Sequence, residues 1–316
     1  MILIYAGGPH RPAYTIDDLA HLLAVIDTSD HPVGWLSDGA LFLEYWTVSG
    51  RYYMTWPNGA PSTNNDWTTY LDSLFAPRGP MTRLDSAAAL VGTAVGTPGK
   101  RVGVAIMVPY PDPRADTLRF GEHLFRTTSE TDRVAVAVAY VREASRRFAT
   151  LKRAHETLKA FYWMNEVIHD ADSSLVRQVS VEVHKQGFRF IWIPAYRAAG
   201  WDKWRSLGFD QAWLQPNYFF HPEVPAVRLD SALTLARGAG MGIELEFDRR
   251  MFDTWQFADR LEPYLALLES AADMRGQPIA IYDGGGALFR LARSKDSWQR
   301  ALYQRLVAAL RVADQP

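Results

Sequence analysis

The sequence contains no cysteine among its 316 residues, which excludes disulfide bonds, a thiol nucleophile and cysteine-ligated metals. An excess of charge of one sign is also missing, because 34 Lys and Arg stand against 35 Asp and Glu. Proteins that bind nucleic acid or anionic membrane surfaces normally carry a basic excess, so we expect neither partner. No apolar run reaches the roughly 18 residues that a membrane-spanning helix needs.

A secretory signal is not visible, because Met1 leads directly into an apolar stretch with no basic segment and no small-residue cleavage site. We therefore expect a cytoplasmic protein or a trimmed form of a secreted one, and the compartment stays open. Low-complexity tracts and Gly/Ser linkers are missing as well. The whole chain, 1–316, is therefore expected to form one domain.

Aromatic residues are abundant: they make up 13% of the chain and include 11 tryptophans. One interpretation is a large hydrophobic core. The other is a cleft lined with flat rings, which stack on the apolar faces of sugars. Composition alone does not choose between them.

Eight short apolar runs alternate with amphipathic helical patterns along the chain. The runs are 2–6, 33–36, 102–108, 160–164, 188–193, 211–214, 241–247 and 278–282. Short, continuously apolar strands are typical of parallel sheets that are covered on both faces. Eight such units in about 300 residues predict an α/β fold, the (β/α)8 TIM barrel. The alternative is an open doubly wound sheet, which usually has a G-x-G-x-x-G turn after its first strand, and the turn at Gly7 lacks that spacing.

The longest irregular stretch, about 39–65, is rich in aromatic residues. It contains Tyr45, Trp46, Tyr52, Tyr53 and Trp56. Loops of this length in compact domains are usually functional. We expect this one to form a wall of the cleft.

Active sites of this fold lie at the C-terminal ends of the strands. Residues at those ends are acidic, aromatic or amide-bearing: Asp38, Tyr110, Asn165, Glu166, Trp192, Tyr196, Gln215, Asn217, Tyr218, Glu244, Glu246, Asp248 and Tyr282. The near absence of Arg and Lys disfavours a phosphorylated substrate. Histidines are scattered singly rather than paired, so we expect no metal and no cofactor.

Carboxylates surrounded by aromatic residues are what glycoside hydrolysis requires. One carboxylic acid protonates the leaving oxygen, and a second acts as nucleophile or activates water. Glu166 and Glu246 are the candidates from the fourth and seventh strands. Residues two apart share a strand face, so Glu244 and Glu246 are both expected to point toward the barrel axis. Glu246 lies nearer the strand exit and is preferred, and Glu244 would be deeper.

Several longer stretches resemble a bacterial family known only as domain of unknown function 4855. They include Trp35-Leu36-Ser37-Asp38-Gly39, Phe161-Tyr162-Trp163-Met164-Asn165-Glu166, Leu214-Gln215-Pro216-Asn217-Tyr218 and Gly242-Ile243-Glu244-Leu245-Glu246-Phe247-Asp248. Asn-Glu after strand four with a Glu on strand seven also resembles the retaining barrel glycosidases. That resemblance implies an acid/base role for Glu166 and a nucleophile role for Glu246. Two glutamates on strand seven leave the choice of nucleophile ambiguous.

The first hypothesis is therefore a glycosidase, with retention favoured over inversion, that acts on an oligo- or polysaccharide. Asn165 would hydrogen-bond a ring hydroxyl, and the remaining strand-end residues would line the subsite. The alternative is a barrel that binds carbohydrate without cleaving it. A third hypothesis is a metal-dependent hydrolase built on Asp38 and nearby histidines.

Overall fold

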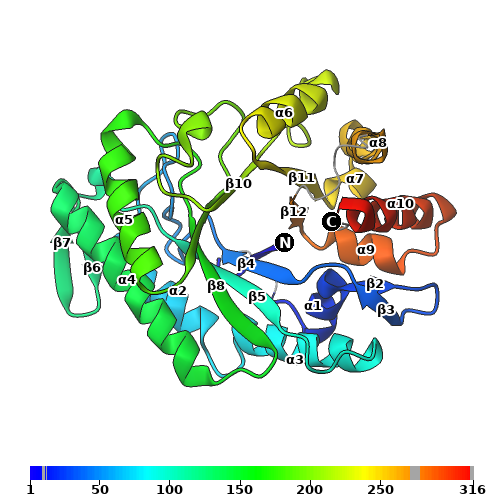
Figure 1. Cartoon of the computed structure of the whole chain (residues 1–316), viewed down its shortest axis with the longest axis horizontal. Helices are drawn as coiled ribbons and strands as arrows, with labels where there is room; N and C mark the ends of the chain where they lie inside the picture. Colours follow the sequence, from blue (N-terminus) through cyan, green and yellow to red (C-terminus); the bar gives the residue numbers. More distant parts are fainter. Residues whose placement is uncertain (9–10, 12, 271–277, 314–316) are drawn as a thin grey trace.

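The computed structural model, which describes residues 1–8, 11, 13–270 and 278–313, contains a closed barrel of eight parallel strands (Figure 1). In chain order the barrel strands are β1 (Ile2–Tyr5), β4 (Gly39–Leu43), β5 (Val102–Val108), β8 (Glu156–Trp163), β9 (Arg189–Trp192), β10 (Gln211–Leu214), β11 (Gly242–Asp248) and β12 (Ile279–Gly284). Strands β1 and β12 pair and close the cylinder, with Ile2 opposite Ile281. The predicted (β/α)8 barrel is confirmed.

Helices surround the barrel (Figure 1). They are α1 (Ile16–Leu23), α2 (Asp66–Leu74), α3 (Pro80–Ala94), α4 (Glu130–Leu151), α5 (Ser173–Lys185), α6 (Val227–Gly238), α7 (Arg250–Asp253), α8 (Glu262–Ser270), α9 (Ala287–Arg293) and α10 (Ser297–Ala313). Thr15 caps α1, because the Thr15 hydroxyl accepts from the Asp18 amide and the Asp18 carboxylate accepts from the Thr15 amide. Within the described part of the chain, no helix is both long and apolar enough to cross a membrane.

Alternation along the strands separates two sets of side chains. On β8, Tyr162 lines the barrel mouth, whereas the flanking Phe161 and Trp163 pack outward against Phe188 and Phe190. Both outward rings are fully buried. The aromatic content therefore serves a large core as well as the mouth of the barrel.

The expected second barrel strand, 33–36, is wrong. Residues β3 (Pro32–Trp35) form an antiparallel pair with β2 (Ala24–Ile26) outside the barrel, with Ala24 opposite Trp35. A second hairpin, β6 (Thr117–Phe120) with β7 (His123–Arg126), lies beyond α4 at the periphery (Figure 1). The second barrel strand is β4, whose residues fall at the start of the predicted aromatic loop. A short apolar run fits a hairpin strand and a barrel strand equally well, because the pairing partner is not encoded locally.

Asp38 does not lie at the C-terminal end of a barrel strand, where the sequence predicts it. It precedes β4, so it lies at the N-terminal end of the barrel, where its carbonyl accepts from the Gly103 amide at 2.7 Å and its side chain is exposed. The aromatic loop correspondingly begins after Leu43 rather than at Gly39. Asp38 is removed from the site on this ground.

Candidate active site

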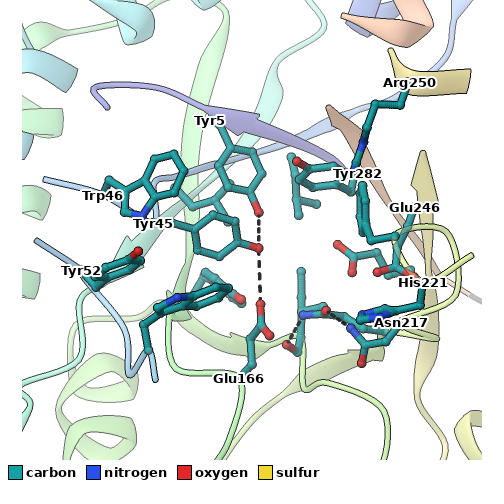
Figure 2. Close-up of a pocket in the computed structure, with 18 residues that line it drawn as sticks. Tyr5, Tyr45, Trp46, Tyr52, Glu166, Asn217, His221, Glu246, Arg250 and Tyr282 are labelled. Carbon is teal, nitrogen blue, oxygen red and sulfur yellow. Dashed lines mark hydrogen bonds between the residues drawn. The ribbon is translucent and has the colours of Figure 1, made fainter. Parts of the chain in front are cut away.

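A cavity of about 340 Å³ opens at the C-terminal ends of the barrel strands (Figure 2). Its walls combine acidic, aromatic and amide side chains: Leu3, Tyr5, Leu43, Tyr45, Trp46, Tyr52, Trp56, Tyr162, Glu166, Ile193, Gln215, Asn217, Phe220, His221, Glu244, Glu246, Arg250 and Tyr282. The three predicted carboxylates therefore share one cavity, together with the predicted Gln215, Asn217 and Tyr282.

The two sides of the cavity differ in character. Figure 2 shows Tyr45, Trp46 and Tyr52 on one side and Glu246 with Asn217 on the opposite side. Glu166 projects into the space between these two sides. A substrate in the cavity would thus have an aromatic wall on one side and carboxylates from two different strands around it.

Glu166 follows β8 by three residues and is partly accessible through the cavity. Its Oε1 accepts a hydrogen bond of 3.4 Å from the Tyr45 hydroxyl, which in turn accepts one of 2.8 Å from the Tyr5 hydroxyl (Figure 2). Burial raises the pKa of Glu166, and hydrogen bonds from Gln215 and Tyr45 oppose that rise. Burial thus shifts Glu166 toward its protonated form relative to an exposed glutamate.

The two glutamates of β11 lie on the same face, as strand alternation predicts. Glu246 is opposite Tyr282 of β12, and Glu244 is opposite Ala280, one step deeper in the barrel. Both carboxyls are almost completely removed from solvent, at 2% and 3% exposure. Their surroundings, however, are different.

Glu246 is held by two donors to a single oxygen. Its Oε2 accepts from the Tyr264 hydroxyl of α8 at 2.8 Å and from the Tyr218 amide at 3.2 Å. Burial raises the pKa of Glu246 to about 7, against the hydrogen bonds from Tyr264 and Tyr218 that favour the anion, and the charge of Glu166 adds to the rise. Near neutral pH, Glu246 is thus balanced between its two protonation states.

Among the residues that the structure describes, none donates a comparable hydrogen bond to the Glu244 carboxyl. Burial raises its pKa well above the ordinary value, and the charges of Glu246 and Glu166 raise it further. Three carboxyls in one low-dielectric cavity cannot all ionise, and Glu244 keeps its proton most firmly.

Arg260 organises the loop that supplies the Tyr218 amide. Its guanidinium lies 3.7 Å from the centre of the Tyr218 ring and donates to the carbonyls of Tyr218, Phe219, His221 and Val224. Asn217, in the same loop, adopts the left-handed conformation (φ 48°), which asparagine tolerates better than most residues. The loop after β10 is thus held in a fixed shape against the cavity.

Besides Asp38, six predicted binding residues lie outside the cavity lining. The Asn165 side chain is used internally: its Oδ1 accepts from the Thr55 amide at 3.0 Å and hydroxyl at 2.6 Å, and its Nδ2 donates to the Val167 carbonyl. Trp192 is fully buried and donates from Nε1 to the Asn165 carbonyl at 2.8 Å. The Tyr110 hydroxyl donates to buried Asp172 at 2.7 Å.

Two more of these residues, Tyr196 and Tyr218, support the loop after β10. The Tyr196 amide donates to the Asn217 Oδ1 at 2.6 Å, and its ring lies under the guanidinium of Arg228. Tyr218 contributes its backbone amide rather than its hydroxyl.

Asp248 also lies outside the lining, where its carboxylate accepts from the backbone amide and the guanidinium of Arg250, the first residue of α7. Within the described residues, no three His, Asp or Glu side chains are grouped so that they could hold a metal ion.

Sequence reasoning missed several residues of the site. Tyr5 could have been found from strand alternation, because it shares the inward face of β1 with Leu3. Tyr264 has none, because a tyrosine on an amphipathic helix looks like a core residue. Glu44, which follows the misassigned β4, is fully buried but neutralised by the Arg11 guanidinium, with Nε to Oε2 at 3.0 Å.

Comparisons with known proteins give one family match. The model of the family described as "Domain of unknown function (DUF4855)" matches residues 1–308. A search of curated proteins finds no match.

Solved structures with similar folds are distant in sequence. A mutant tryptophan synthase alpha-subunit from Pyrococcus furiosus is 10% identical, with a TM-score of 0.41 over 99% of this chain and 96% of that one. A GH113 beta-1,4-mannanase is 9% identical, with a TM-score of 0.47 over 97% of both chains. The carboxyl transferase domain of Rhizobium etli pyruvate carboxylase is 13% identical, with a TM-score of 0.41 over 99% of this chain and 48% of that one. Similarity at this level says nothing about the chemistry of this chain.

Proposed function

We propose that this chain, which belongs to the DUF4855 family, is a glycoside hydrolase that uses Glu166 as general acid/base and Glu246 as nucleophile. The observation that carries the proposal is the convergence of Glu166 and Glu246, from β8 and β11, on one cavity with an aromatic wall. Hydrolysis of a glycosidic bond needs two carboxyl groups in different protonation states on either side of the anomeric carbon.

Glu166 is suited to the acid role. Burial raises its pKa and so favours the protonated form, and donating that proton to the glycosidic oxygen lets the leaving sugar depart as a neutral alcohol. The resulting Glu166 carboxylate then takes a proton from the water that completes hydrolysis. Gln215 and Tyr45, which hydrogen-bond Glu166, stabilise the carboxylate during that half of the cycle.

Glu246 is suited to the nucleophile role better than Glu244. Its carboxylate would form the ester bond to the anomeric carbon as the leaving oxygen takes the Glu166 proton, and water would later break that ester. The Tyr264 hydroxyl and the Tyr218 amide stabilise the anion that must attack. Glu244 lies deeper and keeps its proton, so in this proposal it donates a hydrogen bond from the cavity floor. The outcome is retention of anomeric configuration.

Product analysis of single-site variants tests the proposal. Wild type, Glu166→Gln and Glu246→Gln would be incubated with a polysaccharide panel, and reducing ends and anomeric configuration would be followed by NMR. We expect product with retained configuration from wild type only, with rates in both variants lower by about a thousandfold or more, as a loss of about 4 kcal/mol of transition-state stabilisation implies. Glu122→Gln, in the exposed turn between β6 and β7, is the control that should retain full activity.

Two results would contradict the proposal. Full activity in both carboxamide variants would remove Glu166 and Glu246 from the chemistry. Saccharide binding by wild type without any product would favour the alternative function, a carbohydrate-binding barrel without turnover.

A further inference from the structure

The loop between β4 and α2 holds a pair of stacked rings at the cavity. Tyr52 and Trp56 lie with ring centres 5.5 Å apart and planes 2° from parallel, and Trp46 meets Tyr52 edge-on at 6.2 Å. All three line the cavity. Trp56 nevertheless keeps 46% of its surface exposed. An indole left open beside a catalytic cavity offers a flat apolar face to a ligand.

The loop backbone holds these rings in place before any ligand binds. The Tyr52 amide donates to the Ala60 carbonyl, and the Tyr52 carbonyl accepts from the Ser62 amide, each at 2.9 Å. The Tyr53 amide donates to the Tyr45 carbonyl at 2.9 Å. Gly59 lets the backbone pass close to the Tyr52 ring, because a Cβ at that position would lie 2.6 Å from that ring. The exposure of Trp56 is therefore a property of an ordered loop, and a preorganised surface loses less entropy on binding.

Asn165 fixes this loop relative to the proposed acid. It binds both the amide and the hydroxyl of Thr55, the residue before Trp56, and it is the residue before Glu166. One side chain thus couples the position of the aromatic rings to that of Glu166.

Charge around the cavity favours an uncharged ligand. Among the described lining residues the side chains that can carry positive charge are those of Arg250 and His221. Arg250 is paired with Asp248 at 2.9 Å, and His221 lies 3.1 Å from Glu223. Three glutamates line the same cavity. A uronic acid or sulfated chain would meet no unbalanced positive charge here, whereas a neutral pyranose ring needs only flat aromatic faces and hydrogen-bonding groups.

We propose that Trp56, supported by Tyr52, forms a distal subsite that stacks on an uncharged hexopyranose unit of a glycan chain, away from the bond to be cleaved. The inference rests on the proposed function for its class of ligand. It makes the substrate a chain of several units rather than a disaccharide. Asn165 is a positioning residue in this arrangement, rather than a group that touches the sugar.

Calorimetry on the 316-residue chain without turnover tests the subsite. Cello-, manno-, malto- and chito-oligosaccharides of two and six units would be titrated into Glu166→Gln, alone and combined with Trp56→Ala or Trp56→Phe. Trp255→Ala is the matched control, because Trp255 is 84% exposed and lies outside the cavity lining. A hexameric galacturonan serves as the charged comparison.

We expect Trp56→Ala to weaken binding of a hexasaccharide about tenfold, the effect of losing roughly 1.4 kcal/mol of stacking, with a smaller loss for Trp56→Phe. Disaccharide affinity and the Trp255→Ala control should stay within about twofold of the parent. Equal effects on both chain lengths, no effect on either, preference for galacturonan, or no binding by any neutral chain would each overturn the subsite.

The two proposals fail in different ways. Trp56-dependent hexasaccharide binding without product from the wild-type enzyme leaves the subsite standing and removes the hydrolase. Product formation that Trp56→Ala does not alter at any chain length leaves the hydrolase standing and removes the subsite.

Discussion

Glu156 begins β8, the strand that leads to Glu166 at its other end. Because Glu156 is buried, we expect the free energy of unfolding to depend on pH through this group. Its carboxyl is fully buried, and neither oxygen has a hydrogen-bond partner among the described residues. Burial raises the pKa of Glu156 from 4.5 to about 9, with Asp85 adding to the rise and Arg153 and Arg101 opposing it. The folded protein therefore holds this proton at neutral pH, whereas the unfolded chain releases it.

The sign and size of the effect follow from this difference. Because the folded state binds the proton more tightly, the free energy of unfolding falls as pH rises above 4.5, and it continues to fall until about pH 9. The slope from this group is about 1.4 kcal/mol per pH unit, which amounts to roughly 3 kcal/mol between pH 4.5 and pH 7. Glu156→Gln keeps the shape and removes the titration, so this loss should disappear in the variant.

Urea denaturation of wild type and Glu156→Gln between pH 5 and pH 8 provides the assay. The free energy of unfolding of the variant should gain on that of wild type by about 1 kcal/mol per pH unit across this range. Glu122→Gln, on an exposed turn, should follow wild type throughout. Parallel curves for wild type and Glu156→Gln would refute the reasoning, whatever their absolute separation.

Two further predictions concern the proposed site. Tyr264→Phe removes a donor that stabilises the Glu246 anion, so the pKa of Glu246 should rise above about 7 and the acidic limb of kcat/KM should move about one unit toward higher pH. Tyr303→Phe, which removes a buried hydroxyl bonded to the Ile26 amide, should leave that limb in place, and an unmoved limb in both variants would remove the role of Tyr264. Thr55→Val removes the hydrogen bond from the Thr55 hydroxyl to Asn165, so it should lower the free energy of unfolding by about 1 kcal/mol and weaken hexasaccharide binding. Unchanged hexasaccharide affinity would argue against the coupling of the aromatic loop to Glu166 through Asn165.

Much of the fold is readable from local patterns, and the exception shows the limit. Seven of the predicted apolar runs coincide with barrel strands. Glycines in the left-handed conformation follow α5 and α6, with φ of 81° at Gly187 and 63° at Gly240. The eighth run belongs to the β2–β3 hairpin. Which strands pair depends on contacts between distant segments, and the β4 sequence, which begins at Gly39, carries a weak strand signal.

The site residues likewise divide into those that local patterns predict and those that only contacts between distant segments bring together. Alternation along β11 is sufficient to place Glu244 and Glu246 on one face, and the exit of β8 is sufficient to place Glu166. The donors to Glu246 come from α8 and from the backbone after β10, which no periodicity connects to β11. The sequence predicts that Asn165 faces a sugar, whereas in the structure its side chain hydrogen-bonds Thr55 and Val167.

Arg260 acts on Glu246 indirectly, through the backbone around Tyr218. By holding the Tyr218 segment it keeps a backbone N–H directed at Glu246, although the guanidinium itself has no contact with that carboxylate among the bonds described. Relatives that have replaced Glu246 would be free to lose Arg260 as well, whereas those that keep one should keep the other. Joint inheritance of these two positions across related genomes would therefore distinguish working members of the family from those that retain only the scaffold.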